Sequence, residues 1–165
     1  MRYLTLSLVA SLVIVACGCS SGWRSKDELG RRLYVKWPSD PKELDKAAGN
    51  YMATLADKRP EGLFLFSASI QESAEGLTDD DEAAKVVDVV VGLLGKEISR
   101  KPIEFGGKKF PGLDVTHRGN SGNVIRSVVV RSGTRIYTVS VSLPSEAALS
   151  NRDVVKFFDS LKIDD

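Results

Sequence analysis

Apolar and more polar residues alternate with a period of two at Leu33, Val35 and Trp37, and Pro38 follows them. A two-residue period places every second side chain on the same face of a strand, and proline interrupts strand pairing. The pattern therefore predicts a first strand over residues 33–37 that ends in a turn.

The next apolar positions fit two different structures. Between residues 44 and 55 they have helical spacing, whereas residues 50–57 also show the two-residue period of a strand. Residues 62–70 are strand-like throughout, and the short polar segment before them has the length of a hairpin turn. We therefore expect a β-hairpin of residues 50–57 and 62–70.

A helix is predicted after this hairpin, from Thr78 to Leu94. Thr78 and Asp81 have the spacing of a helix N-cap, and the acidic residues 79–82 suit the positive end of the helix dipole. Most later residues are Ala, Val or Leu, which is typical of a helix buried on most of its circumference. The valines also favour a strand over residues 86–91, which is the competing interpretation.

From residue 98 to residue 143, short apolar segments alternate with glycine-containing turns. Glycine adopts the backbone conformations that tight turns need, so such segments pair as antiparallel neighbours. The predicted strands of this meander are residues 98–105, 110–116, 124–131 and 135–143.

The C-terminal segment predicts a second helix. Ser150 and Asp153 have the spacing of a capping box. Apolar residues follow at helical spacing, namely Val154, Phe157, Phe158 and Leu161. The order of strands, helix, strands and helix predicts an α+β fold in which an antiparallel β-sheet is sandwiched by helices.

The first residues have the composition of an export signal. Arg2 precedes an apolar segment from Leu4 to Ala16, and small residues follow it. This segment is shorter than the roughly 20 residues that a membrane-spanning helix needs. We therefore expect residues 1–16 to be a signal peptide that is removed.

The sequence Ile14-Val15-Ala16-Cys17 resembles the lipobox of bacterial lipoproteins. The resemblance implies diacylglycerol transfer to the Cys17 sulfur, cleavage between Ala16 and Cys17, and attachment of acyl chains such as palmitate. The thiolate is the nucleophile in such a transfer. Cys19 is the competing site, although it places Ala16 where a branched residue is preferred. An uncleaved anchor and cleavage by a general signal peptidase are further alternatives.

Lipidation of Cys17 makes the lipid bilayer a partner and places the protein in the cell envelope. Gly18 stands where an aspartate retains bacterial lipoproteins at the inner membrane, which favours the outer membrane if the host has one. Residues 17–30 are rich in Ser, Gly and charge, so we expect a flexible tether after the lipidated cysteine. Residues 31–165 then form a single domain.

Charge adds two observations. The 165-residue chain has a formal net charge of +1, which loss of Arg2 with the signal brings to zero, and this argues against a nucleic-acid partner. Residues 71–97 hold eight acidic residues and two lysines, whereas residues 98–135 hold eight basic and two acidic residues. The basic segment contains a candidate surface for an acidic partner or headgroup, formed by Arg118, Arg126, Arg131 and Arg135. Pairing of these charges with the acidic helix is the competing interpretation.

Four segments of the domain resemble the ending of PsbP-like domains: Phe110–Val115, Arg126–Val130, Thr134–Tyr137 and Phe157–Ile163. That superfamily includes photosystem accessory proteins and several bacterial lipoproteins. The resemblance implies an antiparallel sheet between helices and a mostly non-enzymatic role. No motif for the metal handling of the photosystem members is present in this sequence.

Candidate catalytic residues are few. His117 is the only histidine, and we expect it at the surface rather than as a ligand or base. Ser121 lies in a glycine-flanked turn, and both cysteines precede the domain, so no zinc-ligand set is recognisable. We expect no cofactor, no metal site and no catalytic residues, and a domain that binds an envelope protein or a small ligand. A small envelope hydrolase acting on cell-wall or glycan material, with carboxylates or with Ser121 and His117, is the first alternative, and a structural spacer is the second.

Overall fold

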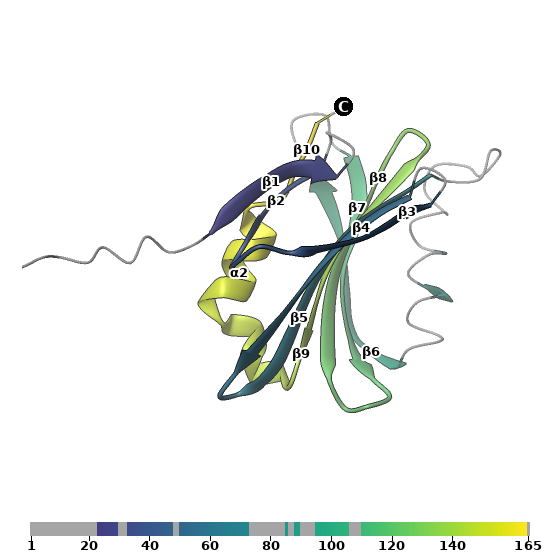
Figure 1. The fold of residues 1–165 in the computed structure, drawn as a ribbon. Helices are drawn as coiled ribbons and strands as arrows, with labels where there is room; N and C mark the ends of the chain where they lie inside the picture. The colour runs from purple at the N-terminus through teal and green to yellow at the C-terminus, as the bar shows by residue number, and fades with distance from the viewer. Residues whose placement is uncertain are drawn as a thin grey trace, which may run out of the picture.

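The computed structural model describes residues 23–29, 33–47, 50–72, 85, 88–89, 95–105 and 110–164. Their strands form a seven-stranded and a three-stranded antiparallel sheet, against which the short helix α2 packs (Figure 1). The predicted signal peptide and the predicted lipidation site Cys17 lie outside the described residues.

The large sheet has the strand order β3-β4-β5-β9-β8-β7-β6. Its strands are β3 Lys42–Ala47, β4 Asn50–Arg59, β5 Gly62–Glu72, β6 Gly95–Phe105, β7 Phe110–Gly119, β8 Val124–Ser132 and β9 Arg135–Leu143. The predicted hairpin and the predicted meander are confirmed, because each pair of consecutive strands in them is hydrogen-bonded. The helical interpretation of residues 44–55 is wrong, since residues 44–47 belong to β3 and residues 50–55 belong to β4.

Glycines shape two turns of the meander, as expected. Gly122 lies between β7 and β8 with a φ of 85°, and Gly133 lies between β8 and β9 with a φ of 58°. Residues with a Cβ atom rarely adopt this left-handed region, so glycine makes these tight reversals possible without strain.

The small sheet contains β1 Arg24–Leu29, β2 Leu33–Trp37 and β10 Lys162–Ile163, with β2 in the middle. The predicted strand over residues 33–37 is therefore confirmed. Residues 24–29 were expected in a flexible tether, and for them that prediction is wrong because they pair with β2. Strand pairing is made by backbone groups, so a segment without an apolar pattern can still join a sheet.

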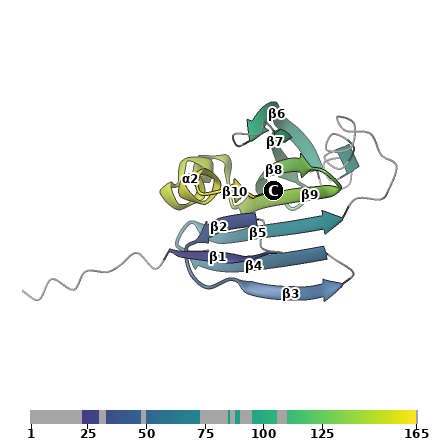
Figure 2. The same cartoon turned by 90° about the horizontal axis from the view of Figure 1, so that it is seen from above.

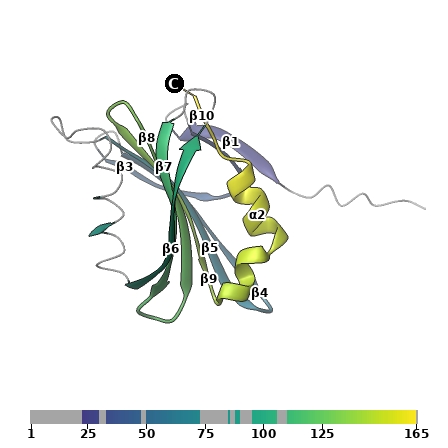
Figure 3. The same cartoon turned by 180° about the vertical axis from the view of Figure 1, so that it is seen from behind.

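Helix α2 Arg152–Asp159 follows the short 3₁₀ helix η1 Glu146–Ser150. Its N-cap is Asn151, whose side chain accepts a hydrogen bond from the backbone N–H of Asp153 at 2.9 Å, so the predicted cap at Ser150 is wrong. The predicted apolar stripe is confirmed for Val154, Phe157 and Phe158, which are buried in α2, whereas Leu161 is buried just after the helix ends. Figure 3 shows α2 running along the part of the large sheet that contains β4, β5 and β9.

The main core lies between the large sheet and a layer built jointly by α2 and the small sheet. Phe157 of α2 packs edge to face against Trp37 of β2 and Phe66 of β5, at centroid distances of 5.2 and 5.0 Å. Figure 2 shows α2 beside β2 and β10, so the helix and the small sheet share this covering layer. Aromatic side chains bury large areas and account for much of the stability of such a core.

The predicted α+β fold, with an antiparallel sheet sandwiched by helices, is wrong. Only Lys85, Asp88 and Val89 of the predicted helix 78–94 are described, and its other residues lie outside the described part of the chain. Strands dominate the described residues, and a second sheet forms part of the layer on the α2 side. That sheet joins the two ends of the domain, and pairing between such distant segments leaves no local sequence pattern.

Within the described ranges, no helix combines the length and the apolar character needed to cross a membrane.

Candidate ligand-binding site

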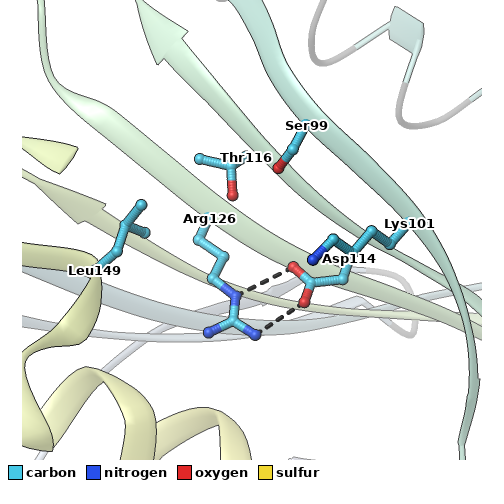
Figure 4. A pocket seen from close by; sticks show the side chains of 6 residues that line it. All are labelled: Ser99, Lys101, Asp114, Thr116, Arg126 and Leu149. Carbon is cyan, nitrogen blue, oxygen red and sulfur yellow. Dashed lines mark hydrogen bonds and ion pairs between the residues drawn. The ribbon is translucent and has the colours of Figure 1, made fainter.

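A cavity of about 200 Å³ opens beside β6, β7 and β8, the last three strands in the order of the large sheet. Its lining consists of Ser99, Lys101, Asp114, Thr116, Arg126 and Leu149 (Figure 4). Five of these residues are polar and come from the three strands, whereas Leu149 comes from η1. The cavity therefore combines a polar floor with an apolar wall.

Strand register brings the five polar residues together. Thr116 of β7 lies opposite Ser99 of β6 and opposite Arg126 of β8. Two residues along β7, Asp114 lies opposite Lys101. Because side chains alternate between the two faces of a strand, all five occupy the same face of the sheet, the face that α2 covers.

Arg126 and Asp114 form an ion pair inside the cavity. Nε of Arg126 donates to Oδ1 of Asp114 at 3.1 Å, and Nη2 donates to Oδ2 at 2.8 Å. The guanidinium also lies over the ring of Phe158 in α2, 4.4 Å from the ring centroid. Two parallel hydrogen bonds and the ring contact together hold the guanidinium in one orientation.

Lys101 adds a second positive charge to the cavity. Its side chain is exposed, and no carboxylate among the described residues forms an ion pair with its ammonium group. Because Arg126 already neutralises Asp114, the lining keeps one net positive charge. The hydroxyl groups of Ser99 and Thr116 supply neutral hydrogen-bonding groups beside it.

Two of the four arginines of the predicted basic surface lie on the α2 side of the sheet. Arg118 is exposed and forms an ion pair with Glu146, while Arg126 is paired with Asp114. Both charges are therefore matched by acids of η1 and β7.

The other two arginines lie elsewhere. Arg131 is buried on the opposite face of β8, and its Nε donates to the carbonyl oxygen of Gly133 at 3.0 Å. Arg135 begins β9, at the end of the sheet away from Arg118. The structure thus does not bring the four arginines together on one open face.

His117 is buried, and the expectation of a surface histidine is wrong. It is 1% exposed, it lies on the sheet face away from α2, and neither ring nitrogen has a hydrogen-bond partner among the described residues. Burial lowers the pKa of His117, which favours the neutral imidazole. The sequence pattern ended this strand at residue 116, whereas β7 extends to Gly119, so His117 lies within a central strand.

Ser121 and His117 do not form a catalytic pair. Ser121 is exposed in the turn after β7, and its Oγ donates to Oδ1 of Asn123 at 2.5 Å. Neither ring nitrogen of His117 has a hydrogen-bond partner among the described residues, so His117 is not hydrogen-bonded to Ser121. Across the described ranges, no group of three metal-binding side chains comes together either.

Sequence reasoning identified Arg126 but missed the remaining residues of the cavity. A signal was present, because Ser99 and Lys101, and likewise Asp114 and Thr116, are polar residues two positions apart in strands. Such spacing places each pair on one face. Which face is covered by α2 depends on how the helix returns onto the sheet, and the local pattern does not contain that information.

No protein-family model matches the chain, and no curated protein matches it in sequence. Solved structures are similar in fold. The cyanobacterial PsbP of Synechocystis sp. PCC 6803 matches with a TM-score of 0.54 and 12% identity, covering 92% of this chain and 99% of that protein. PA94 of Pseudomonas aeruginosa, a protein of unknown function, matches with a TM-score of 0.51 and 13% identity, covering 74% and 83% of the two chains. The chain therefore has a PsbP-like fold, and at this identity the likeness concerns the fold alone.

Proposed function

We propose that the protein is a lipoprotein of the cell envelope whose PsbP-like domain is a non-catalytic binding module. Residues 1–16 are removed on export, and acylated Cys17 holds the protein at the bilayer, that of the outer membrane if the host has one. The domain binds a small ligand or an envelope protein through the cavity at β6, β7 and β8.

The cavity is the observation that carries the binding role. Its carboxylate, Asp114, is held by two hydrogen bonds from Arg126, so it is engaged in an ion pair and is not a free general base. A charged group, two hydroxyls and an apolar wall are the features by which pockets orient a ligand. The arrangement supports recognition more than chemical turnover.

The lipobox-like sequence supports the anchor. Each buried CH₂ group contributes about 0.8 kcal/mol to membrane binding, so two or three acyl chains hold a protein at the bilayer stably. A domain that begins with strand β1 at Arg24 then stays close to the membrane surface.

Labelling with an alkynyl fatty acid tests the anchor directly. We expect label in the wild type and in the matched variant Cys19→Ala, and no label in Cys17→Ala, which should also leave the membrane fraction. Label that persists in Cys17→Ala and disappears in Cys19→Ala would move the anchor to Cys19. An unlabelled wild type would contradict the lipoprotein proposal.

Native mass spectrometry of the full chain, purified gently from its own membranes, tests the binding role. We expect a bound small molecule, or a protein neighbour after cross-linking, in repeated preparations. Preparations that consistently lack both would contradict a binding module and favour a structural spacer.

A further inference from the structure

We infer that the cavity at β6, β7 and β8 binds a small organic anion, with one carboxylate or a similar singly charged group held between Lys101 and Arg126. This inference rests on the proposed binding function and assigns the chemical class of its ligand.

The lining of the cavity has a net positive charge. Asp114 and Arg126 cancel each other through their two-point ion pair, which leaves the ammonium group of Lys101 as the unmatched charge. A singly charged anion completes this balance, whereas a cation would meet Lys101 and a carboxylate that is already neutralised.

The orientation of Arg126 leaves one of its nitrogens available to a ligand. Its hydrogen bonds to Asp114 use Nε and Nη2, and Nη1 donates to no described residue. In Figure 4 the nitrogen away from Asp114 lies on the side of the cavity where Leu149 is drawn. A guanidinium already fixed by a carboxylate and by the Phe158 ring loses little conformational freedom when it donates to a ligand.

Shielding strengthens these contacts. The side chains of Arg126 and Asp114 are 28% and 22% exposed, so a ligand beside them is partly removed from water. Charged hydrogen bonds are stronger in such surroundings than on an open surface. By contrast, Arg118 and Glu146 are about half exposed, at 48% and 51%, and offer no comparable site.

Size and polarity define the rest of the ligand. A volume of about 200 Å³ corresponds to roughly seven water molecules, which suits a short organic acid and not a nucleotide or a glycan chain. Leu149 forms an apolar wall for a short hydrocarbon part, while Ser99 and Thr116 add hydroxyl groups near the charged end.

Calorimetric titration of the full-length chain in nonionic detergent tests the inference with three probes that are no larger than the cavity. These are butyrate, inorganic phosphate and butylammonium. We expect saturable binding of butyrate, weaker binding of phosphate because its larger charge is more costly to desolvate, and no binding of butylammonium.

Three variants locate the site. Lys101→Gln should weaken butyrate binding at least threefold, whereas Arg100→Gln, which removes a charge of the same sign from the other face of β6, should change it less than twofold. Asp114→Asn removes the negative charge that matches Arg126, while the amide oxygen of Asn still accepts one hydrogen bond from that guanidinium. The gain in positive charge should outweigh the looser hold on Arg126 and tighten butyrate binding at least threefold. Equal unfolding midpoints of Lys101→Gln and the wild type would show that any loss is local.

Several outcomes would overturn the inference: absence of butyrate binding up to millimolar concentrations, preference for butylammonium or phosphate over butyrate, an unchanged affinity in Lys101→Gln, or weaker binding in Asp114→Asn. Different outcomes test the proposed function. If acyl labelling at Cys17 and a copurifying ligand persist while butyrate does not bind, only the assigned ligand class is wrong.

Discussion

Two arginines on the α2 side of the large sheet have similar surroundings but different hydrogen-bond partners. Arg59 of β4 lies 4.7 Å from the ring centroid of Phe64, and Arg126 of β8 lies 4.4 Å from that of Phe158. Each is also paired with an aspartate on its own sheet. They differ in how many nitrogens of each guanidinium donate hydrogen bonds.

Arg59 connects the β4–β5 hairpin to the start of α2. Its Nε donates to Asp57 at 2.8 Å, its Nη1 to Asn151 at 3.3 Å and its Nη2 to Asp153 at 2.8 Å. Burial alone lowers the pKa of Arg59, but hydrogen bonds to Asp57 and Asp153 outweigh it and raise that pKa above its ordinary value. With all three nitrogens engaged, Arg59 has a structural role.

Arg126 uses only two of its nitrogens, both on one residue of the neighbouring strand, and it borders a cavity. An aspartate partner is therefore common to both arginines. The difference lies in the guanidinium nitrogens that donate to no described residue, namely none in Arg59 and Nη1 in Arg126.

The largest effect should come from Arg59→Met. This substitution keeps a long side chain next to Phe64 but leaves Asp57, Asp153 and the N-cap residue Asn151 without their shared donor. We expect the free energy of unfolding to fall by about 2–3 kcal/mol, because hydrogen bonds to charged groups contribute about 1.5–3 kcal/mol each and this site is partly exposed. Urea unfolding followed by tryptophan fluorescence measures the change, and a loss below 0.5 kcal/mol (roughly the range of ordinary surface substitutions) would contradict the structural role.

Arg126→Met should cost less stability and more ligand binding. It leaves one half-buried carboxylate, Asp114, unpaired, so we expect a loss of about 1–2 kcal/mol in the free energy of unfolding. Butyrate binding should disappear in the same variant, whereas Arg59→Met should retain it under conditions where that variant is folded. Loss of binding in both variants to the same degree would remove the functional distinction between the two arginines.

Acidification should produce a smaller effect, through His117. Burial holds the pKa of His117 below its ordinary value of 6.5, and Glu97, opposite it on β6, is hydrogen-bonded to Arg100 instead. Below pH 6.5 the His117 imidazole is protonated more readily in the unfolded chain than in the folded chain. The free energy of unfolding is therefore fully retained above pH 6.5 and declines as the pH falls toward the folded-state pKa of His117. The decline in unfolding free energy should be weaker in His117→Leu, and identical pH profiles of the two proteins would contradict it.

The smallest effect should come from Arg118→Gln. Arg118 and Glu146 are about half exposed, and exposed ion pairs contribute roughly 0–1 kcal/mol. We expect a change below about 0.5 kcal/mol, and high salt should reduce even that difference. A loss as large as that of Arg59→Met would show that pairing on this face contributes to stability regardless of burial.

Much of the large sheet was predictable because its information is local. The hairpin and the meander follow from two-residue periods and glycine turns, and the stripe of α2 follows from helical spacing. The cap of α2 was misplaced by one residue, since Ser150, Asn151 and Asp153 all have capping side chains and only the folded backbone shows that Asn151 accepts the bond. The strand β1 was missed because polar residues carry no apolar period.

The candidate site was predictable only in part. Arg126 stood out as one of several basic residues, but its ion pair with Asp114 depends on the register between β7 and β8. In the sequence, Lys101 is one of many charged residues, and only the register between β6 and β7 places it opposite Asp114. The position of His117 also depends on the folded structure. Because β7 is longer than predicted, a residue expected at the surface is buried.

The sequence alone contains the strand and turn pattern of the sheet, the apolar stripe of α2 and the lipobox-like segment that ends at Cys17, because each of these depends on residues close together in the chain. The covering layer of α2 and the small sheet, the burial of His117 and the cavity of Lys101, Asp114 and Arg126 exist only in the folded protein. They depend on register and on contacts between distant segments, and such contacts leave no trace in the local order of residues.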